Sequence, residues 1–244
     1  MRFSSIVAVA LLAMVAVGAS ADQPYNQYSD VPPGTQTGTP SGQNPNQAGS
    51  TEALQFWNDR ASFEAAFPGL PTEDFSATLV APGGVASCDP PFNSSTNNAC
   101  FAPGGILPGL EVNVNTVTGG GLLVVLGTGF LGNTNVLAGP NSFGDDMVLN
   151  FDPAVRAVGL DFVNPGTPGN VYSVTIYGPG GPLDTANVTD GPEGTFWGVD
   201  SDDVGGITSI VFEAFGSDAH AELTTLVIFG GEPVPVELQS FDVE

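Results

Sequence analysis

The feature that most constrains the fold is the stretch from residue 155 to residue 178, VRAVGLDFVNPGTPGNVYSVTIYG. Apolar side chains occupy alternate positions in its first half, and the second half repeats this pattern with Ser173 and Thr175 between apolar residues. A period of two is typical of a half-buried strand. The prolines and glycines of NPGTPGN, between the halves, favour a turn. We therefore predict a β-hairpin within an antiparallel sheet.

The same alternation recurs from residue 110 onward, with turns bearing glycine or proline at the spacing expected of a sandwich or barrel. Helical signals are confined to LQFWNDRASFEAAFPG, where Asn58 or Asp59 is a suitable N-cap and Pro68 stops the helix. We predict an all-β fold, a two-sheet jelly-roll-like β-sandwich with one short helix capping one end. The strands expected are residues 72–76, 110–118, 121–126, 136–137, 147–151, 158–162, 172–176, 184–188, 195–199, 207–213, 223–229 and 236–243.

Three segments divide the chain. Residues 1–21 combine the basic Arg2, a short apolar run and an A-x-A site, which predicts a cleaved signal peptide and an exported, extracellular protein without membrane insertion after cleavage. Residues 22–50 are rich in Gln, Asn, Pro, Gly, Ser and Thr, and they contain too little apolar surface to offset their ordering entropy, so we expect a disordered spacer. Residues 51–244 form the predicted β-sandwich domain.

The charge balance is one-sided, with 26 acidic residues against 3 basic ones and no lysine. Nucleic acids and anionic lipid headgroups need a basic surface, so both are excluded as partners. Divalent cations and basic partners would be attracted. Solubility of an extracellular protein also explains the acidity. Adaptation to salt is a competing explanation, but charged residues make up only 12% of the chain, which is low for a surface built on dense acidic charge.

Cys88 and Cys100 are the only cysteines. In an exported protein such a pair is most simply a disulfide. Its polar loop, DPPFNSSTNNA, has no core of its own, and its closure would stabilise the fold by about 3 kcal/mol.

Calcium is the cofactor that the acidic clusters favour. The segment DSDDVGG places Asp200, Asp202 and Asp203 beside two glycines, and calcium accepts carboxylates in irregular loops. Glu73 is a further candidate ligand. The hypothesis is one structural calcium ion, and the alternative is a solvated acidic turn.

Catalytic signals are few. The single histidine, His220, lies in GSDAHAE, and no G-x-S-x-G nucleophile motif accompanies it. Adjacent carboxylates such as Asp145 and Asp146 point to opposite faces of a strand, so they cannot form a catalytic pair there. We expect no enzyme, with a glycoside-active enzyme that uses an acidic pair as the remote alternative.

Exposed aromatic rings are the usual platform for sugars. Trp197 and Tyr177 are the candidates, but Trp197 follows Phe196 in a strand, so one of these two rings points inward and the other outward. If Trp197 is the outward ring, it binds ligand; a rim or interface residue is the other reading.

Several segments together resemble exported bacterial β-sandwich proteins of the PEP-CTERM-associated type. They are FWNDRASFEAAF leading to EDF, MVLNFDPAVRAVGLDF, VTIYG and GTFWGVDSDDVGGITSIVF, within residues 56–229. The resemblance implies a secreted, surface-associated, non-catalytic jelly roll distantly similar to carbohydrate-binding modules. The chain departs from the pattern at its end, GGEPVPVELQSFDVE, which has no sorting tail, and at Thr224 and Thr225, where an aspartate is common in such proteins.

The function expected from these observations is a secreted binding module for a glycan or another cell-surface ligand. The alternative is a structural subunit of an extracellular layer or filament that self-associates by pairing strand edges.

Overall fold

The computed structural model describes residues 54–116, 121–142, 144–163, 171–189, 195–201, 205–214 and 222–232. All of them belong to the second of the two units into which the chain divides, Gln36–Glu244. The predicted signal peptide, the predicted spacer and the last expected strand, residues 236–243, lie outside the described residues. Within the described part, no helix is long and apolar enough to cross a membrane.

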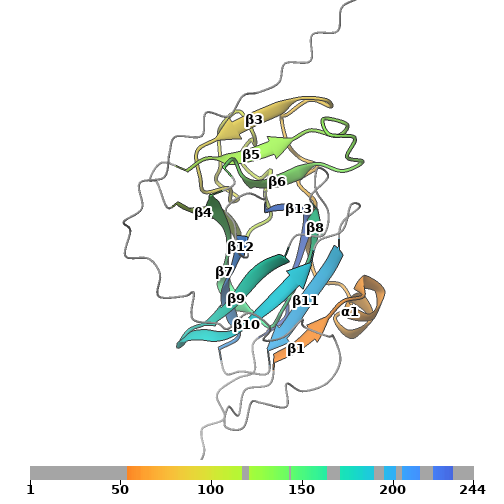
Figure 1. Ribbon diagram of the computed structural model, residues 1–244, viewed down its shortest axis with the longest axis vertical. Helices are drawn as coiled ribbons and strands as arrows, with labels where there is room; N and C mark the ends of the chain where they lie inside the picture. The colour runs from red at the N-terminus through yellow and green to blue at the C-terminus, as the bar shows by residue number, and fades with distance from the viewer. Residues whose placement is uncertain are drawn as a thin grey trace, which may run out of the picture. The chain divides into compact units, whose positions relative to one another are not determined.

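The described residues form thirteen strands and one seven-residue helix (Figure 1). The elements are β1 (Leu54–Trp57), α1 (Arg60–Ala66), β2 (Thr72–Glu73), β3 (Val85–Cys88), β4 (Leu110–Thr116), β5 (Leu123–Leu126), β6 (Leu137–Pro140), β7 (Asp145–Val155), β8 (Ala157–Val163), β9 (Val171–Gly178), β10 (Gly181–Thr189), β11 (Thr195–Ser201), β12 (Ile207–Ala214) and β13 (Leu223–Gly230).

These strands build two antiparallel sheets, which confirms the predicted all-β sandwich. One sheet has the order β1-β11-β8-β13-β6-β5-β3, with β2 also paired to β13, and the other has the order β10-β9-β12-β7-β4. From β6 to β13 the chain contributes four strands to each sheet, in the orders β11-β8-β13-β6 and β10-β9-β12-β7. This is the strand order of an eight-stranded jelly roll. The remaining strands extend the two sheets at their edges.

The predicted hairpin at residues 155–178 is wrong in its pairing. Its two halves are β8 and β9, and they belong to different sheets: β8 pairs with β11 and β13, whereas β9 pairs with β10 and β12. Phe162 and Tyr172, one from each half, stack across the core with ring centroids 5.3 Å apart. Alternation predicts which side of a strand is buried but not which strand lies beside it.

The core lies between the inner faces of the two sheets. In β9, buried residues alternate strictly with half-buried ones, so Tyr172, Val174 and Ile176 face inward as predicted. In β8 and β13 nearly every residue is buried. Both faces of these strands are therefore covered, and the element that covers part of their outer face is α1.

The helix begins where the sequence predicts, because the Asp59 side chain accepts the backbone N–H of Ser62 as an N-cap. It does not cap one end of the sandwich, however. Its buried Phe63 packs against Ala157, Leu226 and Ile228 on the outer face of the eight-stranded sheet (Figure 1). The position differs from the expectation because this face has its own apolar residues to cover, which strict alternation would have left polar.

Four rings, which we call the aromatic seal, complete this contact: Trp57, Phe63, Phe67 and Phe196. Phe63 lies 6.0 Å from Trp57, 5.1 Å from Phe67 and 5.5 Å from Phe196, centroid to centroid. Beneath Phe63, Gly159 and Gly198 face each other in register on β8 and β11. A Cβ atom at Gly198 would lie 2.9 Å from a ring atom of Phe63, so the two glycines form the seat of that ring.

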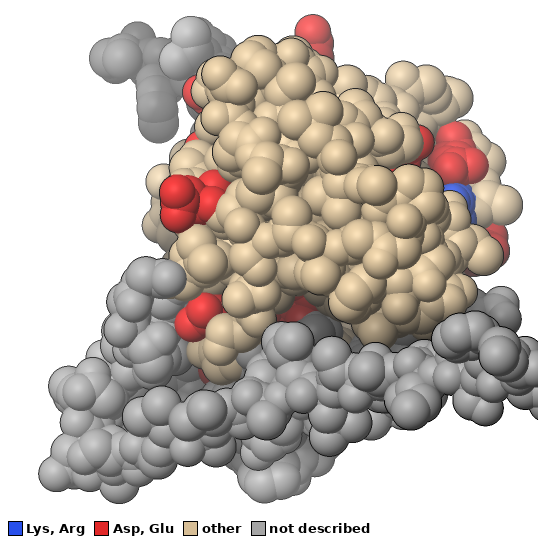
Figure 2. All heavy atoms as spheres, turned by 90° about the horizontal axis from the view of Figure 1, so that it is seen from above, with Lys and Arg blue, Asp and Glu red and all other residues tan. Residues whose placement is uncertain are grey.

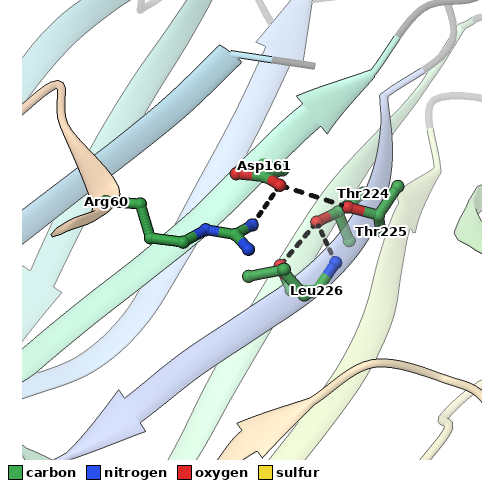
Figure 3. Close-up of polar contacts among 5 residues, drawn as sticks. All are labelled: Arg60, Asp161, Thr224, Thr225 and Leu226. Atoms are coloured by element: carbon green, nitrogen blue, oxygen red, sulfur yellow. Dashed lines mark hydrogen bonds and ion pairs between the residues drawn. The ribbon is translucent and has the colours of Figure 1, made fainter. Parts of the chain in front are cut away.

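Both arginines of the described residues lie at the aromatic seal. Arg60, the first residue of α1, forms an ion pair with Asp161 of β8, and its guanidinium lies 5.9 Å from the Phe196 ring centroid. Asp161 also accepts the Thr225 hydroxyl at 3.4 Å, as Figure 3 shows. The guanidinium of Arg156 lies 5.8 Å from the Phe67 ring centroid. Each contact attaches α1 or the segment beside it to the sheet.

Candidate functional site

The outward side of the five-stranded sheet carries mostly polar side chains, with two valines among them, and we call it the polar face. No described helix or strand covers it (Figure 1). Every second residue of each strand points to this side, and the register of the strand pairs aligns these residues in rows across the sheet. The members are Glu111, Asn113, Asn115, Asp146, Val148, Asn150, Ser173, Thr175, Tyr177, Thr185, Asn187, Ser209, Val211 and Glu213.

One row crosses four strands. Glu111 on β4 lies opposite Asn150 on β7, which lies opposite Ser209 on β12, which in turn lies opposite Tyr177 on β9. Each of these side chains is half-buried. The row thus combines a carboxylate, an amide, a hydroxyl and an aromatic ring on one side of the sheet.

Amide groups surround the Glu111 carboxylate. Its Oε1 accepts the Asn150 side-chain amide at 3.2 Å and that of Asn113 at 3.4 Å, and its Oε2 accepts the Asn93 side-chain amide at 3.4 Å. A second carboxylate–amide contact joins Asn115 to Asp146 at 3.3 Å. Toward the other edge, the hydroxyls of Thr175 and Thr185 lie 3.1 Å apart. The polar face therefore offers donors and acceptors at fixed positions on rigid strands.

These groups suit a ligand with many hydroxyls and no charge of its own. A hydroxyl both donates and accepts, so it can bond to a carboxylate and to an amide in the same row. Tyr177 adds an aromatic ring with a polar tip to the row. Its predicted place at the binding surface is compatible with its outward, half-buried position.

The prediction for Trp197 is wrong, because this ring is the inward one of the pair. It is only 7% exposed, and it packs edge-on against Phe212 of the opposite sheet with centroids 6.2 Å apart. Its neighbour Phe196 points outward, into the aromatic seal. A ring between two sheets cannot stack on a ligand from solvent, so Trp197 is a core residue.

Of the predicted calcium ligands, only Glu73 and Asp200 are among the described residues, and these two are not brought together. Glu73 pairs in register with Val227, which faces the core, and its two oxygens accept the backbone N–H groups of Phe75 and Leu107 at 2.7 and 2.8 Å. Burial of this carboxylate raises the pKa of Glu73 above its usual value of 4.5, against the effect of those hydrogen bonds. Glu73 thus holds two loops together, and its assignment as a calcium ligand is wrong.

Asp200 lies on the opposite face of the same sheet. Its cross-strand partner Ala157 belongs to the apolar cluster under α1, and its Oδ1 accepts the indole N–H of Trp57 at 2.7 Å. This contact fixes one ring of the aromatic seal. Asp202 and Asp203 lie outside the described residues, as does His220. Among the residues that are described, no group of three or more histidine, cysteine, aspartate or glutamate side chains could hold a metal ion.

Cys88 and Cys100 form a disulfide, with their Cα atoms 6.3 Å apart. The bond joins the end of β3 to the loop that precedes β4. Both cysteines are buried, Cys88 being 6% exposed and Cys100 fully buried, so the disulfide belongs to the core. The loop that it closes carries Asn93, whose side-chain amide donates to Glu111 of the polar face.

Sequence reasoning missed the polar face as a site. The signal was present in LEVNVNT, where Glu111, Asn113 and Asn115 alternate with apolar residues. What could not be predicted is that β7, β12 and β9 place Asn150, Ser209 and Tyr177 beside them. No protein-family model, curated protein or solved structure significantly matches this chain. The site therefore rests on its own geometry.

Proposed function

We propose that the protein is a non-catalytic extracellular binding module, and that the polar face binds a glycan or another neutral polyhydroxylated ligand of a cell surface. The observation that supports this most is the contrast between amide, hydroxyl and carboxylate groups aligned across four strands and the absence of basic side chains among them. A negatively charged ligand would be repelled by Glu111 and Asp146. A neutral one can accept from the amides and donate to the carboxylates.

Export is part of the proposal. Residues 1–21 have the composition of a signal peptide, and the disulfide between Cys88 and Cys100 is stable in an oxidising compartment. Calcium is also part of it, with Asp200, Asp202 and Asp203 as the ligands that remain after Glu73 is removed. The same binding experiment can address both the ligand and the ion.

The experiment is a glycan array probed with the purified chain, in calcium and in chelator, followed by calorimetric titration of the best glycan. Tyr177→Ala and Asn150→Ala should each weaken binding about tenfold, equivalent to roughly 1.4 kcal/mol. The matched control is Gln55→Ala, an exposed position on β1 of the other sheet, which should bind like the wild type.

Folding of each variant is checked by its melting temperature. The proposal fails if the folded wild type binds no glycan, or if the two polar-face variants bind as tightly as Gln55→Ala. Calcium is excluded from the proposal if neither binding nor the melting temperature differs between calcium and chelator.

A further inference from the structure

Four large apolar side chains are exposed in the described part of the chain: Leu79 is 59% exposed, Val85 50%, Phe130 39% and Leu131 52%. Three of them, Val85, Phe130 and Leu131, lie at one end of the eight-stranded sheet, which we call the apolar end. Val85 begins β3 and pairs with Leu126 at the end of β5, and the loop after β5 carries Phe130 and Leu131. Exposed apolar side chains gathered in this way are typical of an interaction site.

Hydrogen bonds order the loop that carries Phe130 and Leu131. Asn133 accepts the backbone N–H of Leu131 at 3.0 Å and donates its amide to the carbonyl oxygens of Gly127 and Asn135 at 3.1 and 2.6 Å. The N–H of Gly83 donates to the Thr128 carbonyl at 2.8 Å, which joins this loop to the loop containing Leu79. The apolar end is therefore a built surface rather than a segment free to fold back onto the core.

The apolar end is also the uncharged part of an acidic chain. Residues 112–144 contain no charged residue, and residues 75–111 contain only Asp89 and Glu111. Figure 2 looks toward this end: much of the described surface facing the viewer is uncharged, and the acidic side chains are scattered toward its margins. A formal net charge of −23 makes the remainder of one copy repel the remainder of another.

The strand beneath this surface is an unprotected edge. β3 ends the eight-stranded sheet, and no described strand pairs with its outer side. The edges of the other sheet are protected: β10 contains a bulge between Pro182 and Asp184, and Phe92 forms a two-hydrogen-bond bridge to Val112 of β4. β3, with the sequence VASC, has neither charge nor proline.

We propose that the apolar end binds a second copy of this chain, with β3 pairing antiparallel to β3 of the partner copy. A two-fold axis through this edge continues the eight-stranded sheet and brings Val85, Phe130 and Leu131 of both copies to one interface. The low charge of the apolar end favours a second copy of this chain over a basic partner. A basic partner finds almost no carboxylates to pair with here, whereas a second acidic copy finds here the surface where repulsion is smallest.

The test is sedimentation velocity of the purified full chain over a range of concentrations, at low salt and at 0.5 M salt. A dimer should form, and added salt should strengthen it because salt screens the repulsion between copies. Leu131→Asp and Val85→Asp should each raise the dimer dissociation constant at least about tenfold. Gln55→Asp is the matched control, since it adds the same charge at an exposed position on β1, and it should dimerise nearly as the wild type does.

Leu131→Asp and Val85→Asp should both fold normally, because Val85 and Leu131 are at least half exposed. Each variant should therefore have nearly the melting temperature of the wild type. A folded wild type that stays monomeric at the highest concentration would overturn the proposal. So would a dimer that tolerates both aspartate variants. Binding of a monomer to phosphatidylcholine vesicles would assign the apolar end to a lipid surface and overturn the proposal as well. None of these outcomes depends on the polar face.

Discussion

The two sheets have similar inner faces but opposite outer faces. Outside the eight-stranded sheet, α1 and the aromatic seal cover β8, β11 and β13, and the residues there are mostly apolar or glycine, with the Asp161 and Asp200 carboxylates bonded to Arg60 and Trp57. Outside the five-stranded sheet, no described element covers the strands, and the residues are mostly amides, hydroxyls and carboxylates. The difference indicates which face serves the fold and which is available to a partner.

Positive and negative side chains are divided between the same two outer faces. Arg60 and Arg156 both contact rings of the aromatic seal, and Arg60 also pairs with Asp161. The described part of the polar face, by contrast, contains only acidic charges. Both arginine side chains of the described residues therefore contribute to the attachment of α1 to the eight-stranded sheet.

Removal of the Phe63 ring should lower the stability of the fold more than any change on the polar face. Phe63→Ala leaves a cavity between α1 and the seat formed by Gly159 and Gly198, and it should lower the free energy of unfolding by about 3–5 kcal/mol. Urea unfolding monitored by circular dichroism measures this. Thr175→Ala, on the polar face, is the contrasting substitution and should cost no more than about 0.5 kcal/mol. Equal losses for the two variants would mean that both outer faces contribute alike.

A smaller loss of stability is expected when a side chain is added at one of the two glycines beneath Phe63. Gly198→Ala places a methyl group 2.9 Å from the Phe63 ring and should lower the free energy of unfolding by about 1–3 kcal/mol. Gly180→Ala is the matched control, since its Cβ would meet nothing within 4 Å. Because the closest contacts of the methyl group are with the Phe63 ring, with the Phe196 ring next at 3.3 Å, Gly198→Ala should cost less in a Phe63→Ala background. Strict additivity in that double-mutant cycle would show that the glycine does not seat the ring.

The smallest expected effect concerns pH. Burial raises the pKa of Asp161 above its usual value of 3.8, although Arg60 opposes this shift, and burial likewise raises the pKa of Glu73 and Asp184. The folded chain then binds these protons more tightly than the unfolded chain. Their stabilising contribution is complete at pH values below the unfolded pKa and is lost as the pH rises through the folded pKa.

Urea unfolding midpoints should therefore increase as the pH falls from 7 toward the ordinary pKa values of these groups, 3.8 for the two aspartates and 4.5 for Glu73. Asp161→Asn should flatten this dependence, whereas Asp89→Asn, which removes one charge from an exposed position, should leave it in place. A midpoint that decreases over this range, or an equal slope in Asp161→Asn and the wild type, would contradict the assignment.

The sequence predicted individual strands better than their neighbours. The alternation in β9 and the N-cap of α1 are local signals, and both are confirmed. Pairing is not local: β8 and β9 are adjacent in sequence and lie in different sheets. The alternation also left two choices open at Phe196 and Trp197, which only the packing against Phe63 and Phe212 decides.

Other features escaped prediction for similar reasons. The sequence does not predict the four-residue strands β1 and β3. β1 directly precedes the helical segment, and β3 lies within a stretch rich in glycine, proline and asparagine. The bond from Trp57 to Asp200 joins residues 143 positions apart. The sequence around Asp200 contains no local signal of this hydrogen bond to the indole.

The placement of the two arginines also bears on how long such a chain survives proteolysis. Enzymes of the trypsin type cleave after lysine or arginine, and within the described residues only Arg60 and Arg156 offer such bonds. The first lies in α1, and the backbone of the second is bonded to Gly230, Gly231 and Ser201. Cleavage must then await opening of the α1 contact or of the sheet itself, so digestion by these enzymes is governed by the stability of the fold.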